Sequence, residues 1–187
     1  MIIGLAGQKG SGKDTIAAYL VKKYGFQRRA FADPLKKSVA ELLDIPFHEV
    51  DKYKNDAEAT ISVNINGNQL VSIFTMREFL QRYGTESHRN VFGEDFWLEH
   101  CLPMNGFYAG KKIVITDLRF ANEARRVKFF NGIVVKINRN FTDAQSSHPS
   151  ENIDVFPDYM IDNDGTIDDL FLDVEELLER VGAASYA

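Results

Sequence analysis

Residues 2–15 read IIGLAGQKGSGKDT and contain the strongest structural signal in the sequence. Residues 2–6 form a short apolar run followed by Gly7, which is typical of a buried parallel strand. The turn from Gly7 to Lys13 fits the pattern G-x-x-x-x-G-K. From Lys13 to Tyr24 apolar residues recur at three- and four-residue spacing, which predicts a helix that ends before the next glycine.

A strand, a glycine-rich turn and a helix in direct succession are typical of a P-loop, which binds nucleotide phosphates. The glycines let successive backbone N–H groups point at phosphate oxygens, and the helix N-terminus adds partial positive charge. Lys13 is expected to bridge the β- and γ-phosphates during transfer. A glycine turn without a ligand is the alternative. The predicted ATP-binding residues are Lys9, Gly10, Ser11, Gly12, Lys13, Asp14 and Thr15.

The rest of the chain alternates apolar strand patterns with amphipathic helices. Strand patterns lie at 111–116 and 132–137, and Thr166 begins a last amphipathic helix. This alternation predicts an α/β fold, the three-layer P-loop NTPase fold, with a mainly parallel sheet flanked by helices. The 187 residues suit one domain, 1–187.

Two stretches interrupt this alternation and are predicted to be insertions. The first, about 45–100, contains a hairpin pattern around Asn66-Gly67, a strong turn signal. Thr75 to Glu78 has the form of a capping box, so a helix should begin there and end near Gly84. The second, about 139–152, is polar without an apolar period and is predicted to be a lid. We expect the first insertion to bind the acceptor substrate.

Composition excludes several classes of protein. The chain has 22 basic and 27 acidic residues, a net charge of −5, which disfavours a non-specific binder of nucleic-acid polymers. One cysteine, Cys101, excludes an intrachain disulfide and a multi-cysteine zinc site. No stretch approaches the roughly 20 apolar residues of a membrane span, and the N-terminus lacks signal-peptide features. We therefore expect a cytoplasmic protein without a membrane partner.

Carboxylates at two positions predict a Mg²⁺ site. Asp14 stands where most P-loops carry a serine or threonine, and it could hold the metal directly or through water. Asp117 directly follows the apolar stretch IVIT, the position of a Walker B carboxylate. The alternative for Asp117 is an aspartate that caps the next helix.

Arginines and amides suggest where an acceptor would bind. Arg77 and Gln81 are four residues apart, so they share a helix face, where an arginine fork suits a phosphate and an amide suits a base edge. A solvated face is the alternative for them, a helix N-cap for Asp33, and a core position for Trp97. The predicted substrate-binding residues are Asp33, Lys36, Arg77, Gln81, Gly84, Thr85, Arg89 and Trp97.

Two further arginines are predicted to act with Lys13 in catalysis. Arg119 lies two residues after Asp117, and Arg139 begins the predicted lid. The positive charge of both side chains could stabilise the negative charge that develops during phosphoryl transfer. A merely solvated side chain is the alternative for Arg139.

Six segments in order carry a resemblance to one family. They are GQKGSGKDT (7–15), FADPLKK (31–37), LQRYGTESHR (80–89), ITDLRFANEA (115–124), HPSEN (148–152) and NDGTIDDL (163–170). Together they resemble the phage-type deoxynucleoside monophosphate kinase family across nearly the whole chain. The resemblance implies a nucleoside monophosphate kinase fold, ATP with Mg²⁺ as donor, a dNMP as acceptor and a homodimer. A phage-encoded chain would work in the host cytoplasm.

The leading hypothesis is thus the reaction ATP + dNMP → ADP + dNDP. The sequence lacks the N-K-x-D of a GTPase and the L-S-G-G-Q of a transporter ATPase. A kinase for another small acceptor, such as dephospho-coenzyme A, is the first alternative, and its hydroxyl would need a base, for which Asp33 is the candidate. A nucleotide-sensing module without turnover is the second alternative.

Overall fold

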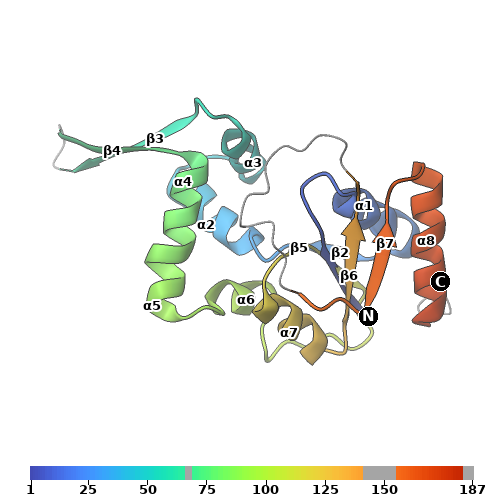
Figure 1. Ribbon diagram of the computed structural model, residues 1–187. Helices are drawn as coiled ribbons and strands as arrows, with labels where there is room; N and C mark the ends of the chain where they lie inside the picture. The colour runs from blue at the N-terminus through green and yellow to red at the C-terminus, as the bar shows by residue number, and fades with distance from the viewer. Residues whose placement is uncertain (66–68, 141–154, 183–187) are drawn as a thin grey trace. The chain divides into compact units, whose positions relative to one another are not determined.

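The computed structural model describes residues 1–65, 69–140 and 155–182, which form two compact units (Figure 1). The sheet unit comprises Met1–Phe31 and Leu102–Ala187, and the insertion unit comprises Ala32–Cys101. The insertion therefore begins earlier than the predicted residue 45, because the helix that starts at Asp33 packs within it. Most of the predicted lid lies outside the described residues.

The sheet unit is built on five strands in the order β2-β5-β1-β6-β7, and every neighbouring pair is parallel. The prediction of a mainly parallel α/β sheet is therefore confirmed. The chain passes from β1 to strands on one side of it and later to strands on the other side. Ligands of such sheets bind at the carboxyl ends of the strands where this order reverses. The strands are β1 Ile2–Ala6, β2 Gln27–Arg29, β5 Ile113–Leu118, β6 Ile133–Asn138 and β7 Tyr159–Asp162.

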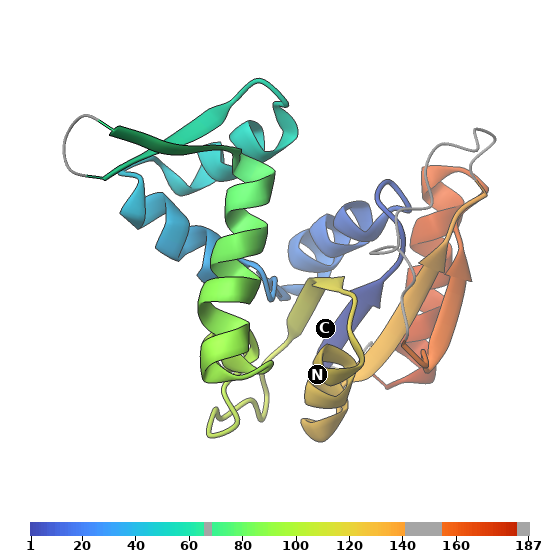
Figure 2. The ribbon, with the colours of Figure 1, turned by 60° about the vertical axis from the view of Figure 1, so that its left-hand side comes forward.

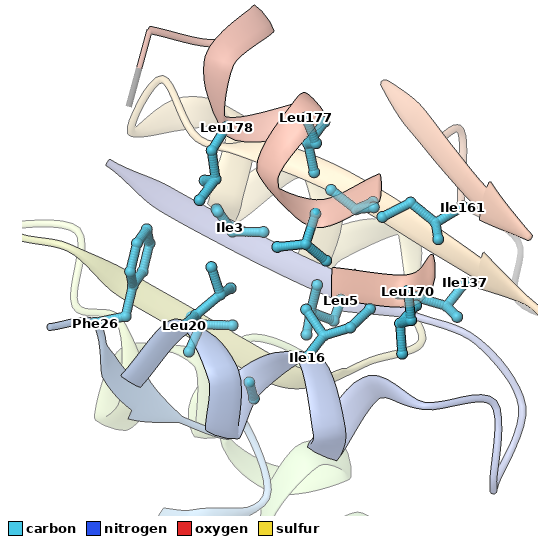
Figure 3. Close-up of a cluster of buried hydrophobic side chains, with 14 residues drawn as sticks. Ile3, Leu5, Ile16, Leu20, Phe26, Ile137, Ile161, Leu170, Leu177 and Leu178 are labelled. Atoms are coloured by element: carbon cyan, nitrogen blue, oxygen red, sulfur yellow. The ribbon is translucent and has the colours of Figure 1, made fainter. Parts of the chain in front are cut away.

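Two helices, α1 Lys13–Tyr24 and α8 Ile167–Arg180, cover one face of the sheet. Alternate residues of β1, Ile3 and Leu5, join these helices in one apolar core (Figure 3). Its helical members include Ile16, Leu20, Leu170 and Leu178, each at most 4% exposed. Full burial of one such side chain contributes about 1.5–3 kcal/mol, so this core is the main reason why α1 is held against β1.

Helix α7, Ala121–Phe129, covers the opposite face of the sheet (Figure 2). Gly4 lies under it, and a Cβ there would be 2.6 Å from Leu118 Cδ1 and 3.3 Å from Val127 Cγ2. A glycine in the middle of β1 therefore lets α7 approach the sheet closely. Helix, sheet and helix form the three predicted layers.

The insertion unit has its own small core around Val39, Val50, Met76 and Leu80. A two-stranded antiparallel hairpin is present as predicted, although its turn lies outside the described residues. The elements are α2 Asp33–Leu42, α3 Phe47–Asn55, β3 Thr60–Ile65, β4 Gln69–Thr75, α4 Met76–Gln81, the π-helix η1 Arg82–Arg89, α5 Asn90–Phe92 and α6 Phe96–Cys101.

The helix after the hairpin begins as predicted but ends later. Thr75 Oγ1 accepts a hydrogen bond from the Glu78 N–H (3.2 Å), and Glu78 Oε2 accepts one from the Thr75 N–H (2.9 Å). The predicted end at Gly84 is wrong, because α4, η1 and α5 follow one another up to Gly93, whose φ is 106°. Gly84 serves packing instead, since a Cβ there would lie 2.9 Å from Leu35 Cδ2.

The start of α2 also differs from the prediction. Ala32 is the N-cap and makes no side-chain capping hydrogen bond, while Asp33 is the first helical residue and Pro34 follows in the first turn. An aspartate in the first turn is still favourable, because its charge complements the helix dipole. Within the described ranges no helix is both long and apolar enough to cross a membrane.

Candidate functional site

The glycine turn connects the carboxyl end of β1 to α1 in a conformation that glycine alone adopts readily. Gly10 has a φ of 81° and Gly12 a φ of 106°. Helix α1 begins at Lys13, and its N-cap Gly12 makes no side-chain capping hydrogen bond. The N-cap residue thus leaves the first backbone N–H groups of α1 without a capping side chain of its own, which is the arrangement that suits binding of an anion.

Lys13 lies over this turn. Its Nζ donates hydrogen bonds to the backbone oxygens of Gly7 (2.7 Å) and Gln8 (2.6 Å), and it is 3.5 Å from Ser11 Oγ. The ammonium group is therefore held at the turn by neutral oxygens. Phosphate oxygens would form stronger, charge-assisted hydrogen bonds with it than these carbonyls do.

Asn163, directly after β7, supports the turn, a role that no pattern in the sequence predicted. Its Nδ2 donates to the backbone oxygen of Ser11 (2.8 Å), and its backbone N–H donates to the oxygen of Asn138 (2.8 Å). Ser11 and Asn163 are 1% and 8% exposed. The signal that could have found Asn163 is its place directly after a short strand, at the sheet edge where the glycine turn also lies.

Asp117 lies within β5 instead of after it, and it is half-buried. Its Oδ1 accepts a hydrogen bond from the backbone N–H of Phe31 at 2.7 Å. The alternative role predicted for Asp117 was to cap the next helix. Glu123 caps that helix instead, because its Oε2 accepts hydrogen bonds from the N–H groups of Arg119 (2.6 Å) and Phe120 (3.0 Å) at the start of α7.

Asp14 is exposed in the first turn of α1, beside Lys13. The described part of the chain contains no group of three or more His, Cys, Asp and Glu residues arranged around a metal position. Mg²⁺ does not need such a cage, because it commonly binds one or two carboxylates, water and the phosphates of its substrate. Oxygen donors such as Asp14 and Asp117 fit this ion and do not favour zinc or copper.

Arg139 reaches the glycine turn from the end of β6. Its Nη1 is 3.4 Å from the backbone oxygen of Gly10, and the side chain is otherwise exposed. The next residue is fixed, since Asn140 donates from its backbone N–H and its Nδ2 to the carboxylate of Asp164 (2.7 and 2.6 Å). Arg119 is exposed after the carboxyl end of β5. The structure therefore brings Arg139 to the turn, whereas within residues 1–65, 69–140 and 155–182 it shows no such contact for the Arg119 side chain.

The insertion unit carries the residues predicted to bind the acceptor. Arg77, Gln81 and Thr85 are exposed and Arg89 is half-buried along the uninterrupted run of α4 and η1. Since each follows the previous one by four residues, their side chains succeed one another along the helix, and Thr85 does not lie in a loop as the sequence suggested.

Two other predicted acceptor residues have partners within the insertion unit. Lys36 Nζ pairs with the carboxylate of Asp51 at 2.8 Å, and the Lys36 side chain is only 12% exposed. Trp97 is 8% exposed, and its Nε1 donates to the backbone oxygen of Gly84 at 3.0 Å. Trp97 therefore lies in the core of this unit, and a direct contact with substrate stays a prediction.

Comparison with known proteins points to one family. The family described as deoxynucleotide monophosphate kinase matches residues 47–174. A protein of Acanthamoeba polyphaga mimivirus described as "Putative deoxynucleotide monophosphate kinase" is 33% identical over 158 residues, covering 81% of this chain and 80% of that protein.

Solved structures with a similar fold are more distant. Shikimate kinase from Aquifex aeolicus is 15% identical with a TM-score of 0.46, and all of both chains is covered. Shikimate kinase from Bacteroides thetaiotaomicron is 15% identical with a TM-score of 0.44, covering 96% of this chain and 98% of that one. The strand order and the glycine turn of this chain by themselves show the fold.

Proposed function

The chain belongs to the deoxynucleotide monophosphate kinase family, and we propose that it transfers the γ-phosphoryl group of ATP to a deoxynucleoside monophosphate, giving ADP and dNDP. The observation that carries this proposal is the placement of Lys13 over a glycine turn at the N-terminus of α1. That turn can hold phosphates, and the family membership supplies the class of acceptor.

The donor phosphates bind at the turn. Backbone N–H groups of Gly10 and of Gly12 to Thr15, at the N-terminal end of α1, stabilise the negative oxygens, whereas the Ser11 N–H donates to the oxygen of Gln8. Lys13 exchanges the oxygens of Gly7 and Gln8 for phosphate oxygens, so its charge meets the charge that develops in the transition state. Lys9 and Ser11 belong to the same loop.

A Mg²⁺ ion accompanies the ATP in this proposal. Bound to the phosphates, it neutralises part of the charge that builds up on the transferred group. Asp14 and Asp117 hold it, directly or through water, because a first-turn aspartate and a strand carboxylate provide the hard oxygen donors that this ion prefers.

The acceptor binds to the insertion unit. Arg77 grips the acceptor phosphate, and the amide of Gln81 faces the base. Asp33, Lys36, Gly84, Thr85, Arg89 and Trp97 complete the predicted set, with Gly84 and Trp97 acting through packing. The acceptor phosphate is ionised at neutral pH, so the reaction needs alignment and charge neutralisation and no general base.

In this proposal the positive side chains of Arg119 and Arg139 neutralise part of the negative charge of the phosphates. The contact of Arg139 with the Gly10 oxygen supports a role at the donor phosphates. We also propose that the stretch from Arg139 to residue 152 acts as a lid that excludes water, which would otherwise accept the phosphoryl group. A homodimer is a further part of the proposal and is open to sedimentation analysis.

An assay of ADP release tests the proposed reaction. The four dNMPs, the matching ribonucleotides and dephospho-coenzyme A are each offered with ATP and Mg²⁺, and Lys13→Ala serves as the inactive control. We expect release that depends on a dNMP and disappears in the control. Release with dephospho-coenzyme A alone would support the first alternative. Binding of ATP without any acceptor-dependent release would support a sensing module.

A further inference from the structure

The turn that would hold the donor phosphates contains a peptide unit whose orientation is fixed by a distant side chain. The backbone oxygen of Ser11 accepts a hydrogen bond from Asn163 Nδ2 at 2.8 Å, and this contact is buried. Asn163 follows β7 and is itself attached to the end of β6, because its backbone N–H donates to Asn138. The amide group is therefore held in place independently of the turn.

The direction of the Ser11 oxygen determines the direction of the next N–H group. The peptide bond between Ser11 and Gly12 is trans, so its C=O and N–H point in opposite directions. As long as the oxygen is bound to Asn163, the N–H of Gly12 points away from β7. That N–H belongs to the set of donors in the glycine turn.

The residue that follows this peptide unit allows the unit to rotate when the bond to Asn163 is lost. A glycine on its C-terminal side tolerates nearly any φ, so rotation of the unit costs little there. Gly12 is required for a second reason: a Cβ on it would lie 2.5 Å from Asn163 Nδ2. The glycine that lets the amide approach therefore also lowers the cost of rotating the peptide unit when the amide is lost.

On the basis of the kinase function proposed above, we propose that Asn163 is a positioning residue for the donor phosphates. It touches no substrate and acts through the Ser11–Gly12 peptide unit. Its hydrogen bond keeps the Gly12 N–H directed for phosphate binding. Loss of the bond weakens binding of ADP and ATP and slows transfer, while the acceptor site in the insertion unit keeps its affinity.

The test compares Asn163→Leu with Asn138→Leu, a matched change on the neighbouring strand end. The Asn138 amide donates to Asp162 Oδ1 at 2.9 Å, and this bond is exposed. Calorimetry gives the Kd for ADP, steady-state kinetics give kcat and both KM values, and thermal unfolding gives Tm. For Asn163→Leu we expect the ADP Kd to rise about tenfold, the size of effect of one lost hydrogen bond to a charged group. We expect a lower kcat and an unchanged KM for dNMP, and none of these changes in Asn138→Leu.

A merely structural role for Asn163 would lower Tm and leave the ADP Kd and kcat unchanged, and this result would overturn the proposal. Equal shifts of the ADP Kd in both variants would also overturn it. If Asn163→Leu does not fold, Asn163→Ser removes the same donor with a small polar side chain and is judged by the same criteria. If the wild type transfers no phosphoryl group to any dNMP, the proposed function fails, and the ADP Kd still decides the role of Asn163.

Discussion

Asp117 Oδ1 accepts a hydrogen bond from the backbone N–H of Phe31, with 2.7 Å between the two atoms. Phe31 is 3% exposed and is the last residue of the sheet unit before the chain enters the insertion unit. Asp117 therefore has a structural role, which is to bind the segment that follows β2, in addition to its proposed role as a Mg²⁺ ligand. The two roles can be separated, because only the second needs the negative charge.

Asp117→Asn should separate these roles. An asparagine oxygen can still accept the Phe31 N–H, but it is a weaker ligand for Mg²⁺ than a carboxylate. We expect a higher Mg²⁺ concentration for half-maximal rate and little change in the free energy of unfolding. Asp117→Ala should also lose about 2 kcal/mol of stability, since a buried N–H is left without its acceptor. A Mg²⁺ titration of the rate and urea unfolding measure both; an unchanged Mg²⁺ dependence in both variants would contradict the metal assignment.

Lys13→Ala should reduce kcat by about 100-fold or more, because removal of one preorganised donor to transition-state charge has an effect of this order. The fold should remain, since the ammonium group donates to backbone oxygens of its own loop, those of Gly7 and Gln8. Single-turnover kinetics and circular dichroism measure the two effects. Lys22→Ala is the control, as Lys22 is exposed in the last turn of the same helix. A wild-type kcat in Lys13→Ala would refute the phosphate-binding assignment.

Gly84→Ala tests whether this glycine is present for packing against α2. Alanine is about 1 kcal/mol better than glycine inside a helix. Against this, the new Cβ would lie 2.9 Å from Leu35 Cδ2, and overpacking costs about 1–3 kcal/mol. We expect Gly84→Ala to destabilise the wild type slightly and to stabilise a Leu35→Ala background. Urea unfolding followed by the fluorescence of Trp97, the only tryptophan, measures this cycle. Stabilisation in both backgrounds would show that Leu35 does not constrain this position.

The same glycine shows why the sequence predicted some elements and not others. Thr75 and Glu78 predict the helix start from local sequence alone, since both capping partners lie within four residues. The presence of Gly84 within the helical run is explained by Leu35, which is far away in the sequence, so the sequence pattern wrongly predicted a helix end at this glycine. A local pattern reports local hydrogen bonds, whereas a glycine kept for close packing can be identified only once its neighbour is known.

The candidate site likewise contains residues that a local motif predicts and residues that only the fold brings together. The strand, glycine turn and Lys13 are contiguous, so one motif located them. Asn163 is 152 positions from Ser11, and only the parallel register of β6 and β7 brings it to the turn. Asp117 was identified at the right strand, but its bond to Phe31 crosses from β5 to the segment after β2 and no spacing rule predicts it.

The capping box of α8 should make stability depend on pH in the acid range. Asp169 Oδ2 accepts hydrogen bonds from the N–H (2.8 Å) and Oγ1 (2.7 Å) of Thr166, and these bonds lower the pKa of Asp169 below its ordinary value of 3.8. A lowered pKa means that the folded state favours the charged form. Its contribution is complete above pH 3.8 and is lost as the pH falls through the lower folded value.

The loss of stability caused by Asp169→Asn should therefore be larger at neutral pH than at an acid pH well below the ordinary pKa of 3.8. Asp168→Asn, the same charge change one residue earlier in the exposed first turn, is the control and should show a smaller dependence. Urea unfolding at both pH values supplies the free energies. Equal pH dependence in the two variants would mean that the capping bonds do not set this behaviour.

The acceptor site is tested by Arg77→Ala and Gln81→Ala. Both side chains are exposed on α4, so neither substitution should disturb the core of the insertion unit. If Arg77 binds the acceptor phosphate, its loss should raise the KM for dNMP about tenfold or more and leave the KM for ATP nearly unchanged. If Arg77 only forms surface ion pairs, the effect should be small, since such pairs contribute about 0–1 kcal/mol. Gln81→Ala should instead change the order in which the enzyme prefers the four dNMPs, because an amide can hydrogen-bond to the base.

Arg82→Ala is the matched control. Arg82 directly follows Gln81 in the same helical run and is exposed, and its guanidinium lies 4.8 Å from the centre of the Phe74 ring. Kinetics with each substrate varied separately decide between these possibilities.

Equal small effects of Arg77→Ala on the KM for dNMP and the KM for ATP would show that the acceptor binds elsewhere. Arg119 or Arg139 would then be the leading candidate for binding the acceptor phosphate.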